Sequence, residues 1–256
     1  MPVRDSEAII LRSFPLGEGD RLVSFLSRAN GRVRGVASGA RKPKSRFGST
    51  LEIFSYVRVW FYERETRDLV RINQCDLLES FFGAQRDYAS ELVLALASEV
   101  TEAVLGEREV AEPNFRLLLA IGRAIKAGAD HRIVSSYFAL WIVRLGGWLP
   151  RLDRCGQCGS AISGSGYFSD GGGVLCRACS ARGHAYCSSG ALELASHMLV
   201  NKLDAFLKPD SGANGLRAAD AYELRNIMLN VIERHIEKKL RTRKLLDEIR
   251  GLSANA

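Results

Sequence analysis

The spacing of apolar residues changes near residue 80, and this change limits the chain to a fold that is first β and then mainly α. Before this point, segments rich in Val, Ile, Leu, Phe and Tyr are separated by short polar stretches, and Asn30-Gly31 lies between two of them. An Asn-Gly pair flanked by apolar runs is a strong hairpin signal. The pattern predicts strands at residues 6–14, 21–28, 31–38, 52–62 and 68–76.

Five closely spaced strands indicate a small barrel or sandwich, and the five-stranded OB-fold is one candidate. From about residue 84 the spacing becomes helical. It predicts helices at 88–106, 114–128, 132–146, 189–207 and 218–240, followed by a short basic segment at 241–250. Residues 150–187, rich in Gly, Ser and Cys, interrupt this pattern. We therefore expect an α+β chain in two domains, with a barrel at 1–80 and a helical domain at 81–256 that carries an insertion at about 150–187.

The insertion contains two C-x-x-C pairs separated by seventeen residues, which is the spacing of a four-cysteine zinc site. Six cysteines are few for a disulfide scaffold of 256 residues, so we expect them to be reduced. A closed four-thiolate site has no open position for a substrate, and its zinc ion would be structural. The alternative is two redox dithiols, which the placement of both pairs in one Gly-rich segment disfavours. The predicted ligands are Cys155, Cys158, Cys176 and Cys179, with His184 and Cys187 as substitutes, while Cys75 is expected in the core.

A stretch without acidic residues lies between Asp20 and Glu52, and it contains eight basic residues. The whole chain has 36 Lys and Arg against 29 Asp and Glu, a net charge of +7. Clustered Lys and Arg neutralise phosphates and release counterions, which favours binding of a nucleic acid. The alternative is an ordinary solvated surface. The candidate nucleic-acid contacts are Arg32, Arg34, Arg41, Lys42, Lys44 and Arg46.

Two further segments allow two interpretations each. Alternation in the strand at 53–62 places Ile53, Val57, Val59 and Phe61 on a core face, and mixes aromatic residues with Arg58 on the other. The residues of that second face are either a base-stacking platform or pack beneath the helical domain, and we favour packing beneath the helical domain. They are Phe54, Tyr56, Arg58, Trp60 and Tyr62. The basic run from Lys238 to Lys244 is interpreted as a helix C-terminus, where cations either stabilise the helix through its dipole or bind a ligand.

No recognised catalytic motif is present in the sequence. It lacks a P-loop, a complete dinucleotide fingerprint and a nucleophile elbow, and Arg154 precedes Cys155 where a zinc deaminase has proline. The longest apolar run, Tyr137–Val143, is far too short to span a membrane. Only Ala8–Leu11 is apolar at the N-terminus, and acidic residues precede it, so we expect no secretory signal and a cytosolic location.

Four stretches resemble the RecO family of bacterial recombination mediator proteins. They are Gly31-Arg-Val-Arg-Gly-Val-Ala-Ser-Gly-Ala-Arg-Lys-Pro-Lys-Ser-Arg-Phe-Gly48, Leu149-Pro-Arg-Leu-Asp-Arg-Cys155, Tyr167-Phe-Ser-Asp-Gly-Gly-Gly-Val-Leu-Cys-Arg-Ala-Cys179 and Leu240-Arg-Thr-Arg-Lys-Leu-Leu246. Their order and spacing match over nearly the whole chain.

The resemblance implies an N-terminal OB-fold followed by a helical domain with a four-cysteine zinc site. It also implies a non-catalytic protein, located in the cytoplasm at the nucleoid, that binds single- and double-stranded DNA and anneals complementary strands. Such proteins help to load the RecA recombinase onto DNA coated by single-strand-binding protein. The implied partners are RecR and the acidic C-terminal tail of single-strand-binding protein, with RecA as an indirect one.

Two other functions stay open from the residues alone. The first is a zinc-ribbon module for protein interaction or transcription with little DNA affinity, which a gel shift at two salt concentrations separates from a DNA-binding protein. The second is a nuclease, which would need divalent metal, and the sequence has no acidic cluster to support it.

Overall fold

The computed structural model describes residues 3–63, 68–81, 88–169, 171, 173–207 and 218–253, with only the backbone described from 249 onward. The chain divides into two compact units, one comprising Met1–Ala127 and Leu240–Ala256 and the other Gly128–Lys239. The domain boundary predicted at residue 80 stays a prediction, because the two compact units meet instead at residues 127–128 and 239–240.

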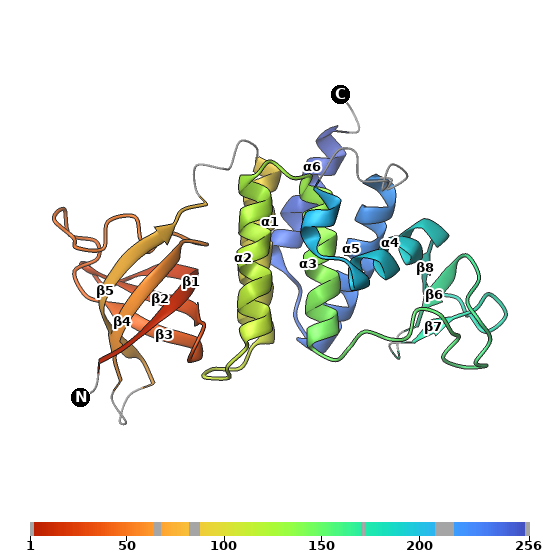
Figure 1. Ribbon diagram of the computed structural model, residues 1–256, viewed down its shortest axis with the longest axis horizontal. Helices are drawn as coiled ribbons and strands as arrows, with labels where there is room; N and C mark the ends of the chain where they lie inside the picture. Colours follow the sequence, from red (N-terminus) through yellow and green to blue (C-terminus); the bar gives the residue numbers. More distant parts are fainter. Residues whose placement is uncertain are drawn as a thin grey trace. The chain divides into compact units, whose positions relative to one another are not determined.

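The first unit begins with a closed five-stranded barrel, coloured red to orange in Figure 1. Its strand order is β1-β2-β3-β5-β4; β3 and β5 are parallel and the other pairs antiparallel. This arrangement confirms the predicted five-stranded OB-type barrel. The strands are β1 (Val3–Leu16), β2 (Asp20–Ser27), β3 (Gly31–Ala37), β4 (Tyr56–Tyr62) and β5 (Val70–Glu79).

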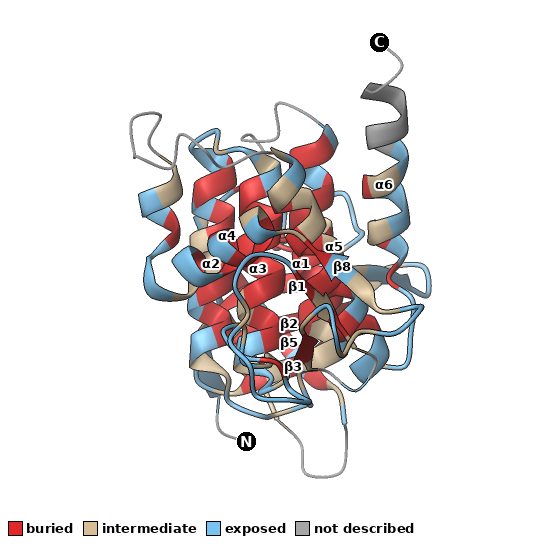
Figure 2. Cartoon of the chain, turned by 90° about the vertical axis from the view of Figure 1, so that its right-hand side faces the viewer, coloured by how far each residue is buried: buried red, intermediate tan, exposed pale blue. Residues whose placement is uncertain are grey.

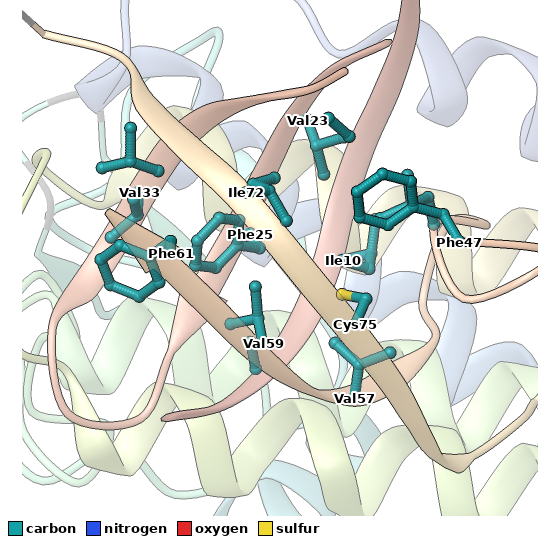
Figure 3. Packing of buried hydrophobic residues seen from close by; sticks show 14 residues of the cluster. Ile10, Val23, Phe25, Val33, Phe47, Val57, Val59, Phe61, Ile72 and Cys75 are labelled. Atoms are coloured by element: carbon teal, nitrogen blue, oxygen red, sulfur yellow. The ribbon is translucent and has the colours of Figure 1, made fainter. Parts of the chain in front are cut away.

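Alternate residues of the strands fill the barrel interior, as the period of two requires. Figure 3 shows this cluster, in which the rings of Phe25 and Phe61 meet edge to face with centroids 5.8 Å apart. Two members come from the connection between β3 and β4 and not from a strand: Phe47 and Leu51 are both fully buried in the same cluster. Burying such a side chain contributes about 1.5–3 kcal/mol, so this long connection is anchored to the barrel.

The segment from Glu107 to Glu109, which follows the first helix of the chain, covers the seam where β3 pairs with β5. Because β5 pairs only with Gly35–Ala37, the first half of β3 has an open edge on that side. The backbone N–H of Arg108 donates to the carbonyl of Arg32 at 2.9 Å and covers this edge. Gly31 has φ +69°, and a Cβ there would lie 2.0 Å from the Glu109 carbonyl oxygen. Only glycine therefore allows this close approach.

Helix α2 (Glu112–Lys126), which follows α1 (Tyr88–Val104) in the chain, packs against the start of β4. Phe54 packs edge to face on Phe81, and Tyr56 packs in the same way on Phe115 of α2. The interpretation that aromatic residues of this segment pack beneath helices is confirmed for Phe54 and Tyr56. The placement of Ile53 in the core was wrong, since its side chain is 49% exposed: the strand begins only at Tyr56, and φ of Phe54 is +66°.

The C-terminal basic run is not the end of one helix, which corrects the interpretation from sequence. Helix α5 (Ala218–His235) ends in the second unit, Glu237 has φ +51°, and α6 (Arg241–Ser253) begins in the first unit. The carboxylate of Glu99 in α1 accepts the backbone N–H groups of Arg241 and Thr242 at 3.0 and 2.9 Å. Glu99 therefore caps the N-terminus of α6.

The second unit contains helices α3 (His131–Leu145), α4 (Ser189–Val200) and α5, a short 3₁₀ helix η2 (Leu203–Phe206) and a three-stranded sheet. Figure 2 shows the buried residues of α3 along its length. The sheet has the order β7-β6-β8, with β6 (Gly166–Phe168), β7 (Val174–Leu175) and β8 (Ala185–Cys187). Strands β6 and β7 pair antiparallel and form a hairpin. None of the described helices combines the length and apolar character that crossing a bilayer requires.

Glu99→Gln is expected to destabilise the first unit by about 1–2 kcal/mol at pH 7, because the charged cap of α6 is lost. Although burial opposes ionisation of Glu99, the N–H groups of Thr242 and Arg241 and the charge of Arg12 lower its pKa. A carboxyl group whose pKa is lower in the folded state than in the unfolded state stabilises the fold at pH values above its unfolded pKa of about 4.3. This stabilisation is lost as the pH falls through the folded-state pKa. Urea unfolding should therefore show the wild type losing its advantage below about pH 4.5.

The matched control is Glu248→Gln, an exposed carboxylate of α6. This variant should have the same free energy of unfolding as the wild type at pH 7 and below about pH 4.5. If the free energy of unfolding of Glu99→Gln stayed below that of the wild type by the same amount at pH 7 and below about pH 4.5, the proposed ionised cap would be contradicted.

Candidate metal centre and candidate nucleic-acid interface

The four predicted cysteine ligands come together in the second unit. The sulfur atoms of Cys155, Cys158, Cys176 and Cys179 all lie within 4.8 Å of one another. The Sγ atoms of Cys158 and Cys176 are 3.8 Å apart. Tetrahedral zinc with bonds of 2.3 Å separates its sulfur ligands by about 3.8 Å, so the cluster has the dimensions of a zinc site.

Backbone turns hold each pair in place. In the first pair, the N–H of Cys155 donates to Ser160 and the N–H of Gly159, at φ +74°, donates back to Cys155. The N–H of Gly156 bonds the Val174 carbonyl at 2.8 Å and so ties this turn to β7. In the second pair, the N–H of Cys179 donates to the carbonyl of Cys176 at 3.1 Å. The hairpin β6–β7 lies between the two turns in the chain and returns it from the first pair to the second.

The negative charges of four clustered thiolates require a compensating cation. The backbone N–H groups of Cys158 and Cys176 lower the pKa of Cys155 to about 6. The neighbouring thiols of Cys158 and Cys176 raise the pKa of Cys179 to about 12, so four thiolates do not form together without a compensating charge. A divalent cation would supply that charge, and the donor set and geometry fit zinc.

The other candidate ligands are not part of the cluster. Nδ1 of His184 accepts the N–H of Ala181 at 3.0 Å instead. Cys187 and Cys75 are buried, and burial raises the pKa of each thiol to about 12. Cys75 belongs to the interior of the barrel, which confirms its expected core position.

The second candidate site is the basic loop, defined here as residues 38–50 between β3 and β4. Its start is fixed by Asp20, whose carboxylate accepts the N–H of Gly39 at 2.8 Å, and by the Arg41 N–H bonded to the Gly19 carbonyl at 3.0 Å. Its end is fixed by buried Phe47. The loop therefore presents its side chains from a fixed backbone, next to the turn between β1 and β2.

Four of the six predicted contacts are exposed in this loop. The guanidinium of Arg41 donates to the Gly17 carbonyl at 2.8 Å, and that of Arg46 lies over the Phe47 ring, 5.1 Å from its centroid. Neither pairs with a carboxylate among the described residues, and the same holds for Lys42 and Lys44. Their charges are directed to solvent and are available to a polyanion.

Arg32 and Arg34 occupy a different environment, on β3 at the seam. Both form ion pairs with Glu107, and Arg32 also donates to the Leu105 carbonyl at 2.9 Å. These contacts brace the segment that covers the β3–β5 seam. The structure thus separates the six candidates into four free cations in the loop and two paired ones beside α1.

Two arginines of the same acid-free stretch are also paired. Arg28 lies between Glu7 at 2.6 Å and Glu112 at 3.1 Å, and Arg21 lies 3.9 Å from Glu52. These pairs could not be predicted from the sequence, because most of the carboxylates are distant in the chain. It also missed the anchoring role of Asp20, although an acidic residue at the edge of a basic stretch was visible.

Comparison with known proteins matches both parts of the chain to one family. The model for the N-terminal part of recombination protein O matches residues 1–81, and the model for its C-terminal part matches residues 85–244. DNA repair protein RecO of Koribacter versatilis is 36% identical over 248 residues, covering 96% of this chain and 99% of that protein.

Two more relatives are similar over nearly their full length. DNA repair protein RecO of Frankia casuarinae is 34% identical over 253 residues, with 96% of this chain and 99% of the relative covered. The protein of the same name in Bifidobacterium adolescentis is 32% identical over 256 residues, with 96% and 100% covered. With an OB-type barrel, a four-cysteine cluster and this similarity along both domains, the chain belongs to the RecO family of DNA repair and recombination proteins.

Proposed function

We propose that this chain is a non-catalytic recombination mediator that binds and anneals DNA strands. In this proposal it helps to load a recombinase onto DNA coated by single-strand-binding protein, with RecR, the tail of single-strand-binding protein and, indirectly, RecA as partners. The proposed nucleic-acid-binding domain is residues 1–80, the rest forming the helical domain, and the protein acts in the cytoplasm at the nucleoid. Membership of the RecO family supports this function.

The observation that carries the proposal is the cluster of four exposed cations, Arg41, Lys42, Lys44 and Arg46, on an anchored loop. Such a surface attracts phosphates and releases their counterions without reading sequence. It also screens the repulsion between two strands held close together. Base pairing then drives annealing, and no nucleotide hydrolysis by this chain is required.

The four-cysteine cluster has a structural role in this proposal. Its four ligands leave no open coordination position, and when zinc is bound it supplies the charge that stabilises the thiolates. The chain's own contribution is to fix two turns and the hairpin between them. Arg32 and Arg34 stay candidate DNA contacts from sequence, but their pairing with Glu107 supports a bracing role more strongly.

Replacing all four loop cations by alanine is expected to weaken DNA binding at least about tenfold at 0.1 M salt, because phosphate contacts are lost. The slope of log affinity against log salt should fall by about 0.7 for each lost contact with single-stranded DNA. Fluorescence anisotropy with a labelled oligonucleotide at several salt concentrations measures both quantities. The melting temperature should change little, since the side chains are exposed.

A charge-matched control removes four exposed cations elsewhere: Arg116, Arg144, Arg182 and Lys202. Equal weakening by the control would show that only net charge matters and not this loop. A wild-type affinity that is flat between low and moderate salt would favour the alternative, a zinc-ribbon protein-interaction module with little DNA affinity.

Cys176→Ser is expected to lose zinc and to destabilise the second unit, since removing one thiolate opens the cluster. Purified wild type should contain one zinc per chain by atomic emission, and a strong chelator should lower its melting temperature. The variant should show neither the metal nor the response to the chelator.

Cys187→Ala is the matched control, because it removes a buried thiol of the same unit outside the cluster. It should keep one zinc per chain even where its melting temperature falls. Wild-type protein that is fully soluble and stable with far less than one zinc per chain would remove the metal site from the proposal.

A further inference from the structure

A short row of polar residues crosses three strands of the barrel and is neutralised at both ends. The register places Arg12 of β1 opposite Ser24 of β2, and Ser24 opposite Arg34 of β3. Arg12 pairs with Glu102 of α1, and Arg34 pairs with Glu107, which follows α1 in the chain. Two carboxylates from beyond the barrel therefore cancel the charges of two barrel cations.

The two ion pairs differ in how firmly they are held. The Glu102 side chain belongs to helix α1 and is only 16% exposed. By contrast, the side chains of Arg34 and Glu107 are 42% and 34% exposed, and Glu107 lies in the connection between two helices. Ion pairs at this level of exposure are weak, because water and salt screen the two charges. A second anion that reaches Arg34 can therefore replace the Glu107 carboxylate while the fold stays intact.

Other contacts hold the backbone of the segment that carries Glu107. Nε of Arg32 donates to the Leu105 carbonyl, and the N–H of Arg108 donates to the Arg32 carbonyl, both at 2.9 Å. Neither bond involves the Glu107 carboxylate, which comes no closer to the Arg32 guanidinium than 3.7 Å. Bracing of the segment is thus achieved mainly through Arg32. The pair with Arg34 adds little to it, and this pair needs another explanation.

We propose that the Glu107 carboxylate is an internal competitor of nucleic-acid phosphates: it occupies the Arg34 guanidinium in the free protein, and a bound strand displaces it. This inference rests on the proposed function and adds a control of affinity to it. Carboxylates and phosphates use the same planar donors of a guanidinium, so the pair must open before a phosphate takes them. Opening the pair costs free energy, and a strand is held less tightly than the cations of the barrel alone would hold it. Weaker holding speeds the release of strands once they have paired.

The test measures the affinity of the full chain for a labelled single-stranded oligonucleotide by fluorescence anisotropy. Glu107→Gln should bind about threefold to fivefold more tightly than wild type at 0.05 M salt, because the cost of opening an exposed ion pair is removed. This gain should shrink towards about 0.5 M salt, where screening already weakens the pair in the wild type.

A double-mutant cycle with Arg34→Ala assigns the gain to this pair. In the Arg34→Ala background, Glu107→Gln should no longer raise the affinity, since no guanidinium is left to be released. Conversely, Arg34→Ala should weaken binding more in the Glu107→Gln background than in the wild type. A gain that persists without Arg34 would overturn the proposal.

Glu109→Gln is the control for net charge. Glu109 is an exposed carboxylate of the same segment and forms no ion pair in the described part of the chain. Its replacement removes the same charge and should change the affinity by less than about 1.5-fold. An equal gain in Glu109→Gln and Glu107→Gln would show that only the total charge matters, and it would overturn the competition.

The unfolding temperature separates competition from bracing. Glu107→Gln should unfold close to the wild-type temperature, because the backbone bonds of the segment stay. If it folds poorly, Glu107→Asp decides, since this variant keeps the charge and shortens its reach by one methylene. Glu107→Asp should show a smaller gain of the same sign, and an unchanged or lower affinity would overturn the proposal.

The remaining outcomes distinguish this inference from the proposed function. A folded Glu107→Gln variant with unchanged or weaker binding would make Glu107 a brace only, while DNA binding by the wild type would stand. A wild type that binds no oligonucleotide at any salt concentration would remove the proposed function, and the competition with it.

Discussion

Burial of Phe47 and Leu51 in the barrel is the interaction on which the candidate nucleic-acid surface depends. A connection as long as residues 38–55 would otherwise sample many conformations, and ordering its backbone costs about 1–2 kcal/mol per residue. Two buried side chains and the Asp20 carboxylate hold its middle and its start. The cations of the loop are therefore presented at fixed positions, and less entropy is lost when a strand binds them.

The paired and unpaired cations of the barrel have different consequences. Surface ion pairs such as that of Arg34 with Glu107 contribute about 0–1 kcal/mol, but they also remove charge from the field that a polyanion meets. Pairing with Glu7, Glu107 and Glu112 is confined to the part of the barrel that meets the segment around α1 and α2. The Asp20 carboxylate binds the backbone of the loop, but no described carboxylate forms an ion pair with the four cations of the loop. The attractive field is therefore concentrated at one end of the barrel, although net charge alone would spread it over the molecule.

Local patterns in the sequence predicted the elements well, and long-range pairing explains what they missed. Period-two alternation in β3 and the spacing of the two cysteine pairs carry their own geometry, so the barrel strands and the four-sulfur cluster followed directly. The cover over the β3–β5 seam joins Arg32 to Arg108, and no local periodicity encodes such a contact. The same is true of the pairs that Glu107 forms with Arg32 and Arg34. Ile53 was misplaced because a positive φ at Phe54 ends the alternation before the strand begins.

The break before α6 changes the meaning of the C-terminal basic residues. At a helix C-terminus these cations would be stabilised by the dipole, but Arg241 and Lys244 lie in the first turn of α6, where the dipole disfavours them. The buried carboxylate of Glu99 offsets this cost by accepting the first two N–H groups of the helix. Helix stability therefore gives no reason for cations at these positions. Since the Arg241 and Lys244 side chains are exposed, their charge adds to the field of the unit that also carries the basic loop.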